Sequence, residues 1–431
     1  MNSMIVRAQS QFGRRYRQFR ELLAVEGPRG ITDRARTVAA RWVSPKNLIM
    51  PVDRADVLAA DLSRPFMAAV PKIIPGQPVV INWVTIPAGA GSGGNTTMFR
   101  MIRYLEMHGY VNRVYFYNVY RGDYRYYESI ARSSYNFHGK IAGLEGGMED
   151  AHAVVATSWA TAYPVFNSCC SGKRFYFVQD FEPYFYAVGA FSFLAENTYR
   201  MGFHAITAGR WLAEKLSAEF DMSADFFEFG CDLSRYRRLP YSKRNGVVFY
   251  ARPEAARRGF ELGLMAIEMF AARHPEIEIH FYGKKMGKLP FRFVDHGRIT
   301  PDELNHIYNR CYAGLSLSLT NVSLVPHEML AAGCIPVVND AVHNRIVLDN
   351  AFVRYSPPYP QALAAELEAL VVTANFDELS RAAATSVRSA TWDDAGAKVD
   401  AILRRTLETN PPTQTNPSTA IDSARVQDRT L

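Results

Sequence analysis

Short runs of β-branched and aromatic residues alternate with helical segments in the first half of the chain. The runs are mostly apolar, and segments of helical periodicity separate them. Strands that alternate with helices in this way are typical of a parallel sheet with helices on its faces. The block ends near residue 225. The expected strands are 78–84, 113–119, 151–159, 174–180 and 204–209, and the clearest helices are 96–109 and 209–220.

The same rhythm begins again after an irregular stretch at 227–246. A second run of strands and helices predicts a second sheet, so the fold class is α/β with two doubly wound domains. In such folds ligands bind beyond the carboxyl ends of the strands, so we expect a cleft between the two sheets. We place the domains at 46–235 and 236–408. The expected strands of the second are 247–253, 277–283, 293–297, 313–319 and 335–340, with helices at 254–274, 301–310 and 326–333.

The two ends of the chain differ from the blocks between them. Residues 1–45 carry nine arginines against three acids, with apolar residues at helix-compatible spacing. This arm is either a solvated basic helix or an amphipathic segment that rests on anionic lipid. Residues 409–431 are polar and rich in proline and threonine, so they are expected to form a disordered tail.

Composition narrows the class of protein. Of the 431 residues 48% are hydrophobic and 21% charged, which excludes disorder of the whole chain. The net charge of +7 owes much to the N-terminal arm, so it does not by itself indicate nucleic acid. The five cysteines have no C-x-x-C spacing, and no apolar run approaches the roughly 20 residues that span a bilayer. We therefore expect a cytoplasmic protein, with peripheral contact at the inner face of the membrane through the arm.

Four glycines follow the first strand, within GAGSGGNTTMFRMIRYL at 89–105. Gly89, Gly91 and Gly94 fit the G-x-G-x-x-G pattern of a dinucleotide fold. That fold needs an acid at the end of the second strand to hold the ribose, but Asn118 and Tyr120 stand there. An NAD site is therefore disfavoured.

A phosphate-binding P-loop also fits this segment only in part. Asn95 stands where the P-loop lysine is required, so an ATPase is disfavoured as well. Two interpretations stay open for Gly93 and Gly94. They allow either an anion to approach the first N–H groups of a helix or close packing between helix and strand.

The second domain supplies cations. Arg252 stands at the end of its first strand, and Arg257 and Arg258 are expected in the first turn of the next helix. Arginine forks match the geometry of a diphosphate, and positive charge at a helix N-terminus is unfavourable unless an anion offsets it. We therefore expect an anion beside at least one of this pair.

A polar turn at 320–323 follows a buried strand and leads into a short helix. Pro326 opens this helix, Gly333 closes it, and Glu328 lies in its first turn. A glutamate in this position could accept hydrogen bonds from the vicinal hydroxyls of a ribose or sugar. The alternative is that the helix dipole favours an acid at this position and that the glutamate binds no ligand.

Several of these motifs together resemble a known family. YARP with RRGFEL, SLTNVSLVPHEMLAAG, and VQDFEP followed by AENTYR and WLAEKL are similar to the WsaF-type rhamnosyltransferases, a branch of the GT-B glycosyltransferases related to family 4. The resemblance runs from about Val79 to Asn344. It implies the GT-B fold with two Rossmann-like domains. It also implies a nucleotide-activated sugar bound chiefly by the second domain and an acceptor glycan bound by the first.

The resemblance also implies roles for single residues. Family 4 enzymes carry two glutamates eight positions apart; Glu328 matches the second, which holds the ribose, whereas Thr320 stands at the first. The usual contact with the hydroxyls of the donor sugar is therefore altered, which leaves the donor sugar open. Arg252 and Arg258 fall at the positions that bind the diphosphate.

A general base, if one is used, is best sought in VQDFEP, where Asp180 and Glu182 follow a strand. The alternative is that these carboxylates anchor a loop. The sequence contains no D-x-D motif, and we expect neither a metal nor a cofactor. The remaining donor-binding candidates are Gly93, Gly94, Asn95, Thr320, Asn321, Ser323, Leu324 and Asn344.

The leading expectation is a glycosyltransferase that moves a sugar, L-rhamnose from its dTDP form, onto a surface glycan or a lipid-linked glycan. A transferase of the same fold that uses another UDP- or GDP-sugar is the first rival. A nucleotide- or glycan-binding protein without catalysis is the second, because of Thr320. Binding to nucleic acid has the least support.

Overall fold

The structure is a computed structural model that describes residues 39, 50–64, 68–87, 89, 91–119, 124–240 and 243–408. The predicted tail at 409–431 and, except for residue 39, the predicted arm at 1–45 lie outside these residues. Among the described residues, no helix combines the length and the apolar character needed to cross a membrane.

The first sheet is parallel throughout the described residues, with strand order β3-β2-β1-β4-β5-β6-β7. Its central strands are buried almost completely, as expected of strands that helices cover on both faces. Because the chain order reverses between β1 and β4, the carboxyl ends of these strands form the expected ligand-binding edge. The strands are β1 (Val80–Thr85), β2 (Val111–Phe116), β3 (Lys140–Gly143), β4 (Ala153–Ala156), β5 (Lys173–Val178), β6 (His204–Ala208) and β7 (Ala224–Phe227).

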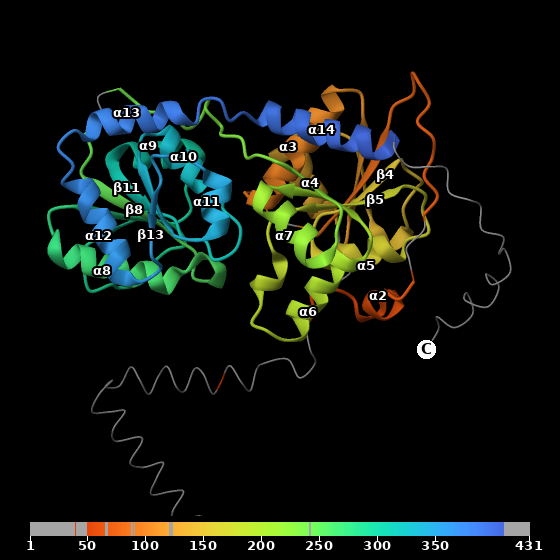
Figure 1. Cartoon of the computed structure of the whole chain (residues 1–431), viewed down its shortest axis with the longest axis horizontal. Helices are drawn as coiled ribbons and strands as arrows, with labels where there is room; N and C mark the ends of the chain where they lie inside the picture. The colour runs from red at the N-terminus through yellow and green to blue at the C-terminus, as the bar shows by residue number, and fades with distance from the viewer. Residues whose placement is uncertain are drawn as a thin grey trace, which may run out of the picture. The chain divides into compact units, whose positions relative to one another are not determined.

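Helices cover both faces of this sheet (Figure 1). Helix α3 buries an apolar stripe against the sheet, formed by residues such as Met98, Ile102 and Leu105 at helical spacing. Helix α5 packs against β1, β4 and β5. The helices of this part are α2 (Arg54–Ala59), α3 (Gly93–Met107), α4 (Arg125–Tyr135), η1 (Leu144–Gly146), α5 (Trp159–Asn167), η2 (Glu182–Phe185), α6 (Ala190–Asn197), η3 (Thr198–Arg200) and α7 (Arg210–Phe220).

The second sheet is also parallel, with strand order β10-β9-β8-β11-β12-β13. It repeats the architecture of the first sheet, so both predicted domains have the doubly wound fold. Its carboxyl edge contains the loops that follow β8 and β11. The strands are β8 (Gly246–Ala251), β9 (Glu278–Gly283), β10 (Val294–Asp295), β11 (Cys311–Leu315), β12 (Ile335–Asn339) and β13 (Arg354–Ser356).

In the second domain α8 and α12 lie on one side of the sheet, and α9, α10 and α13 lie on the other (Figure 1). Local sequence signals explain several boundaries. Thr300 and Glu303 form a capping box at the start of α9, and Pro301 occupies its first turn. The helices are η4 (Ala256–Arg258), α8 (Phe260–Arg273), α9 (Pro301–Arg310), α10 (Val325–Ala331), α11 (Val342–Leu348), α12 (Pro360–Val371), α13 (Phe376–Ser386) and α14 (Trp392–Glu408).

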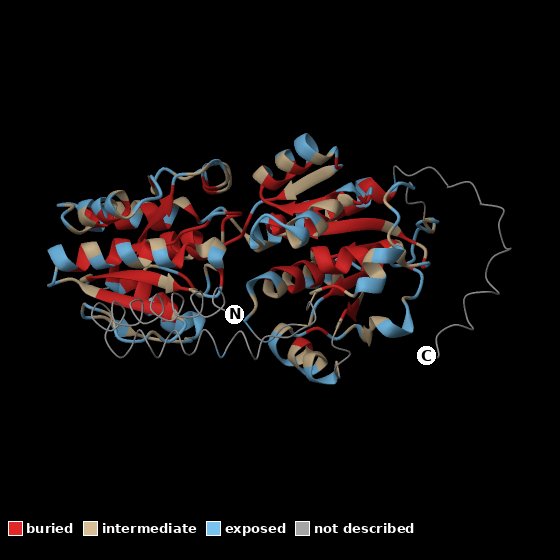
Figure 2. Ribbon diagram, turned by 90° about the horizontal axis from the view of Figure 1, so that it is seen from below, coloured by how far each residue is buried: buried red, intermediate tan, exposed pale blue. Residues whose placement is uncertain are grey.

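Aromatic side chains fill much of the core. Figure 2 colours the buried residues red, and they follow the strands of both sheets. In the first domain the Phe177 ring stacks on Phe227 with 5.4 Å between centroids and meets Trp83 edge-on at 5.8 Å. In the second, Phe249 and Phe260 stack at 6.0 Å. These contacts fix the strand ends from which the candidate site residues emerge.

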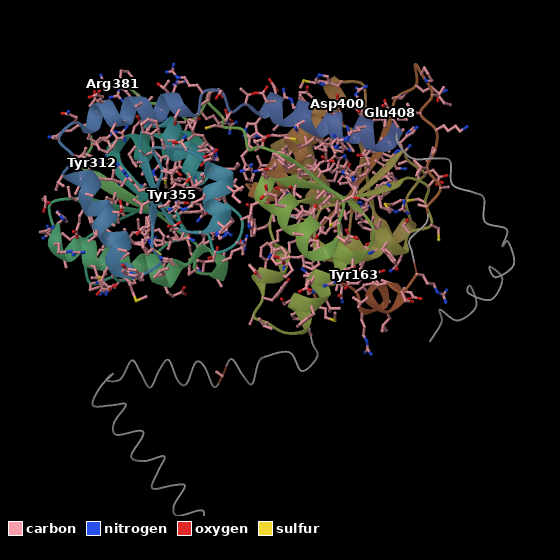
Figure 3. All side chains as sticks on the ribbon, in the orientation of Figure 1. Tyr163, Tyr312, Tyr355, Arg381, Asp400 and Glu408 are labelled. Atoms are coloured by element: carbon pink, nitrogen blue, oxygen red, sulfur yellow. The ribbon has the colours of Figure 1, made fainter. Side chains whose placement is uncertain are left out.

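Helix α14 is the exception to the division into two domains. The sequence places it in the second domain, but it packs against α3 and β7 of the first. Figure 3 marks Asp400 and Glu408 on this helix. The hydroxyl of Tyr110 donates to Asp400, and the Tyr104 ring packs directly on Gly396. Helix α14 therefore ties the two halves together.

The structure differs from the predicted elements at several points. Strands β3, β7 and β13 were not expected, because they are short and lie at sheet edges. The predicted strand 313–319 ends at Leu315, and the residues after it turn into a loop. The predicted helix 254–274 begins only at Phe260, because Gly259 adopts φ 55° and separates it from a preceding 3-10 turn.

Candidate functional site

The turn after β5 presents the two carboxylates that the sequence singled out. Its anchor is Phe181, whose buried ring stacks on Tyr199 at 5.5 Å and lies under the ammonium group of Lys215 at 4.5 Å. Because this ring is held from several sides, the residues before and after it, Asp180 and Glu182, have fixed positions. Both carboxylates are buried, which is unusual unless they have partners.

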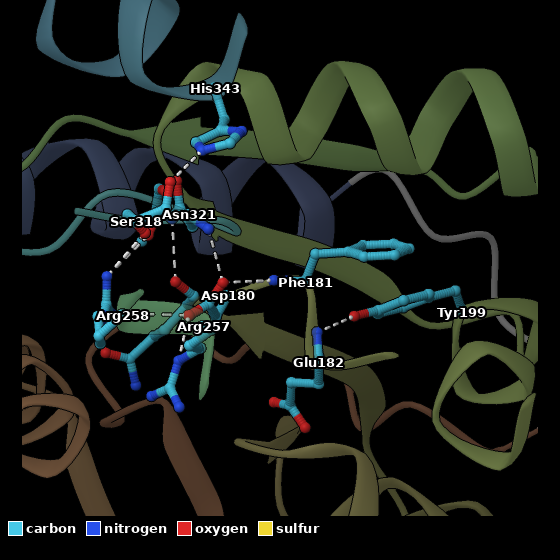
Figure 4. A network of polar contacts seen from close by, with 11 residues as sticks. Asp180, Phe181, Glu182, Tyr199, Arg257, Arg258, Ser318, Asn321 and His343 are labelled. Carbon is cyan, nitrogen blue, oxygen red and sulfur yellow. Dashed lines mark hydrogen bonds and ion pairs between the residues drawn. The ribbon is translucent and has the colours of Figure 1, made fainter. Parts of the chain in front are cut away.

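Asp180 has partners on both carboxylate oxygens, and most of them come from the second domain. Oδ1 accepts the backbone N–H of Asn321 at 2.8 Å and that of Phe181 at 2.9 Å. Oδ2 accepts Nε–H of Arg257 at 3.2 Å and lies 3.9 Å from Nη2 of Arg258. Figure 4 shows these contacts together. Asp180 therefore bridges the two domains. The sequence allowed two roles for this residue, a general base or an anchor, and this contact is an anchoring one.

Asn321 completes the bridge from the other side. Its side-chain Nδ2 donates to the carbonyl oxygens of Gln179 at 3.0 Å and Ala208 at 2.8 Å, which lie at the ends of β5 and β6. Both amide hydrogens are thus used within the protein. The Oδ1 atom of this buried residue has no hydrogen-bond partner among the described residues.

Arg258 is held inside the loop that follows β11. Nη1 donates to Ser318 Oγ at 2.7 Å and to the carbonyl oxygen of Asn321 at 3.2 Å. Nε2–H of His343 donates to the Ser318 carbonyl at 2.8 Å, because a carbonyl can only accept. We call the set Asp180, Arg257, Arg258, Ser318, Asn321 and His343 the interdomain network (Figure 4).

Glu182 lies two residues from Asp180 but has different surroundings. Its Oε2 accepts the backbone N–H of Trp159 at 2.7 Å, at the first residue of α5. Burial raises the pKa of this carboxyl to about 8; the Trp159 N–H opposes the rise, and the negative charge of Asp180 adds to it. A buried carboxyl that binds a helix N-terminus is positioned to support the fold.

The arginine segment after β8 corrects one expectation. Arg257 and Arg258 lie in the 3-10 turn η4, not in the first turn of α8, so the argument from an unfavourable helix N-terminus does not apply to them. The expected anion beside them is nevertheless present, in the form of the Asp180 carboxylate. Arg252 instead pairs with Glu254 at 2.8 Å and donates to the Tyr250 hydroxyl at 2.8 Å.

Glu328 lies in the first turn of α10, as predicted. The residue is partly exposed, but burial of its carboxyl raises the pKa to about 7. The positive charge of Arg100, from α3 of the first domain, opposes this rise, and the negative charge of Asp232 adds to it. The predicted ribose-binding glutamate is therefore close to a cation of the other domain.

The glycine loop opens α3, and its two last glycines are exposed. Gly93 is the first residue of the helix, and a side chain at this position would meet open space. Nε2 of Gln179 donates to the Gly94 carbonyl at 3.1 Å, which joins the loop to the turn after β5. Asn95 follows in the same helical turn and is half-buried. The loop thus adjoins the interdomain network.

The other predicted donor-binding residues lie around the loop after β11. Thr320 is buried, and its Oγ1 has no hydrogen-bond partner among the described residues. Asn344 donates to the Asn339 carbonyl at 2.7 Å, and Asn339 in turn accepts the Ser318 N–H. Ser323 and Leu324 are half-buried just before α10. Their proposed contacts with a donor stay predictions.

Sequence reasoning missed three members of this site: Gln179, Ser318 and His343. Each follows a strand or opens a short helix at the carboxyl edge of a sheet, which is the signal that could have found them. Their partners, however, belong to other elements, so the pairings required the structure.

Cavities of about 630 and 350 Å³ lie outside this site, the larger between the end of α8, the start of β9 and residues 290–294. None of the predicted site residues lines either cavity. Among the residues that the structure describes, no group of three or more His, Cys, Asp or Glu side chains is arranged to hold a metal ion.

Comparison with known proteins identifies the second domain. Residues 245–368 match the family model of the WsaF C-terminal domain. The matched segment, which we call the WsaF domain after the model that it resembles, contains the arginine segment, the loop after β11 and Glu328. The resemblance inferred from the motifs is therefore confirmed.

One curated relative extends the match into the first domain. The chain is 33% identical over 267 residues to the O-antigen biosynthesis protein RfbC of Myxococcus xanthus. The match covers 59% of this chain but only 20% of that protein, so the chain spans about a fifth of its relative.

Solved structures establish the fold. TarM of S. aureus matches with a TM-score of 0.60 at 8% identity, over 75% of this chain and 99% of that one. The pneumococcal O-GlcNAc transferase GtfA matches with a TM-score of 0.59 at 9% identity, over 77% and 100%. The predicted GT-B fold is thus confirmed. Likeness at this level of identity says nothing about the substrate.

Proposed function

We propose that this protein is a glycosyltransferase that moves a sugar from a nucleoside diphosphate onto a glycan acceptor of surface polysaccharide. Within this class we propose L-rhamnose from its dTDP form as the donor and a surface glycan or lipid-linked glycan as the acceptor. The finer assignment rests on the WsaF domain and on the relative named for O-antigen biosynthesis.

One observation carries the proposal: within the WsaF domain, Arg257 and Arg258 face a single anionic oxygen at the carboxyl edge of both sheets. Transfer from a nucleoside diphosphate leaves negative charge on the departing phosphate. Fixed guanidinium groups in a water-poor site can stabilise that charge. The first N–H groups of α3, which adjoin the same network through Gln179, could add to this stabilisation.

The first experiment measures melting temperature with dTDP, UDP, GDP, ADP and NAD. A ligand at 100 times its dissociation constant adds about 2.7 kcal/mol of stability, which a melting curve resolves. We expect a shift with dTDP and none with NAD. Turnover is then measured with dTDP-rhamnose and UDP-sugars on a glycan acceptor, with the glycan product detected directly. A shift with NAD alone would contradict the proposal.

The pKa of Glu328 offers a more specific test. Because burial raises this pKa to about 7, the carboxylate forms between pH 6 and pH 8. A charged acceptor binds ribose hydroxyls more strongly than a neutral one, by about 1.5 to 3 kcal/mol. We expect the affinity for dTDP to rise over this range, and Glu328→Gln to weaken binding about ten- to a hundredfold at pH 8.

Titration calorimetry of wild type and Glu328→Gln at both pH values gives the answer. Titration of the nucleotide itself affects both proteins equally, so only the difference between them reports on Glu328. Parallel pH profiles would return Glu328 to a structural role at the start of α10.

A second candidate is a protein that binds nucleotide without catalysis. Thr320 favours it, because a threonine stands where family 4 enzymes carry a glutamate, and its Oγ1 is buried without a hydrogen-bond partner among the described residues. Such a protein would shift its melting temperature with dTDP yet release no nucleoside diphosphate from any donor and acceptor pair.

A further inference from the structure

The arginines of the segment 252–258 already have partners within the protein. Arg252 holds Glu254 of its own loop, and Arg258 donates to Ser318 and to the Asn321 carbonyl. Arg257 differs, because its hydrogen-bond acceptor is a carboxylate of the other domain, Asp180. Its guanidinium group also lies over the Phe185 ring, 4.2 Å from the centroid. These contacts fix Arg257 at the edge of the first domain.

The surroundings of Asp180 are those of a bound phosphate group. One oxygen accepts two backbone N–H groups, at 2.8 and 2.9 Å, and the other faces two guanidinium groups, at 3.2 and 3.9 Å. Backbone N–H groups with arginine forks are the donors that bind phosphate oxygens in many proteins. The Asp180 and Arg258 side chains are only 12% and 15% exposed, so water screens this contact weakly.

We propose that Asp180 is an internal competitor for the phosphate groups of the donor. A nucleoside diphosphate binds by displacing the Asp180 carboxylate from Arg257 and Arg258. Arg257 is then a phosphate-binding residue in addition to Arg252 and Arg258. This inference rests on the proposed function, since it requires a nucleoside diphosphate as ligand.

Displacement also has a consequence for the domain contact. Asp180 Oδ1 accepts the Asn321 N–H, so the exchange releases a hydrogen bond between the domains. The bonds from Asn321 Nδ2 to Gln179 and Ala208 do not involve the carboxylate and can persist. Phosphate binding therefore loosens the contact without abolishing it.

The decisive variant is Asp180→Asn, which keeps the shape of the side chain and its ability to accept the Asn321 N–H but removes the charge. We expect its dissociation constant for dTDP to be about tenfold lower than that of wild type, since a charge-assisted competitor has been removed. Thymidine, which has no phosphate, should bind both proteins equally. Titration calorimetry measures both ligands, and melting curves verify the fold.

The chain offers a matched control. Asp225 of β7 also pairs across the domain boundary, with Arg405 of α14, but it lies outside the interdomain network. Asp225→Asn should leave the dissociation constant for dTDP unchanged. A general effect of removing one acidic group would instead tighten binding in both variants equally, which would overturn the proposal.

Arg257→Ala tests the other partner. If Arg257 binds phosphate, this variant should bind dTDP about tenfold more weakly, and Asp180→Asn should tighten binding much less in the Arg257→Ala background. An affinity in Asp180→Asn equal to or below that of wild type would refute the competition while leaving the proposed function intact. If no nucleoside diphosphate binds to wild type or to either variant, the proposed function and the competition are both refuted.

Discussion

Two of the contacts between the domains differ in their chemistry. In the first, which we call the helix contact, α14 packs on α3; the Tyr104 ring lies on Gly396, and Arg100 covers the Trp392 ring at 4.4 Å. The second is the interdomain network. There the Asp180 carboxylate accepts charge-assisted hydrogen bonds from the second domain, and the Asn321 amide donates to the backbone of the first. Apolar packing is insensitive to ions, whereas an ion pair can be exchanged for an anionic ligand.

This difference suggests that the two contacts have different roles. We expect the helix contact to hold the domains together in all states of the protein. The interdomain network is the part that we expect an anionic ligand to rearrange. Three further variants can break or sharpen this comparison.

Glu182→Gln should have the largest effect on stability. The effect is a change in how the free energy of unfolding depends on pH. The pKa of Glu182 is about 8 in the folded protein against 4.5 for an ordinary glutamate, so the folded state binds its proton more tightly. The stability this provides is fully present below pH 4.5 and is lost as the pH rises to 8. The loss is on the order of 3 kcal/mol. Glutamine does not titrate, so the variant should lose much less stability as the pH rises.

Urea unfolding at pH 5 and pH 8 measures this difference. Other titrating groups are common to both proteins and cancel in the comparison. If wild type and Glu182→Gln lose equal stability between the two pH values, the carboxyl is not protonated in the fold, and the turn after β5 carries more negative charge than we infer.

Gly396→Val should have the next largest effect and tests the helix contact. A Cβ atom at Gly396 would lie 2.3 Å from Cγ of Tyr104, at the base of a ring that cannot rotate away. Overpacking of this kind costs about 1 to 3 kcal/mol. Gly287→Val is the control, since a side chain there meets open space. Equal stabilities of the two variants in urea would mean that α14 is not packed tightly on α3.

The sequence predicted the fold well where burial is complete. The run at 78–84 is apolar except for Asn82, which identifies a covered parallel strand, and β1 lies within it apart from its last residue, Thr85. It failed at β3, whose residues Lys140–Gly143 lie at a sheet edge and are only partly buried. It also failed at Gly259, because a glycine inside a helical pattern does not reveal whether it continues the helix or adopts a positive φ.

The sequence could predict which residues belong to the site, but not which of them contact one another. Asp180 was found because it follows a strand at the carboxyl edge, and the arginines were found because they follow β8. The contact between Asp180 and these arginines depends on how the two domains face each other. Asp180 and Arg257 are 77 positions apart, and no local pattern encodes their pairing. The same holds for Gln179 and Asn321, which meet across 142 positions.

Arg405→Ala should have the smallest effect, and it separates packing from charge within the helix contact. Arg405 of α14 pairs with Asp225 of β7, but its side chain is 59% exposed. Exposed ion pairs are worth about 0 to 1 kcal/mol and are screened by salt. Asp225 also keeps His204 as a partner at 2.9 Å. We therefore expect urea unfolding to show a loss below about 1 kcal/mol, smaller still in high salt. A loss as large as that of Gly396→Val would mean that charge holds both contacts, and that the contrast between them does not exist.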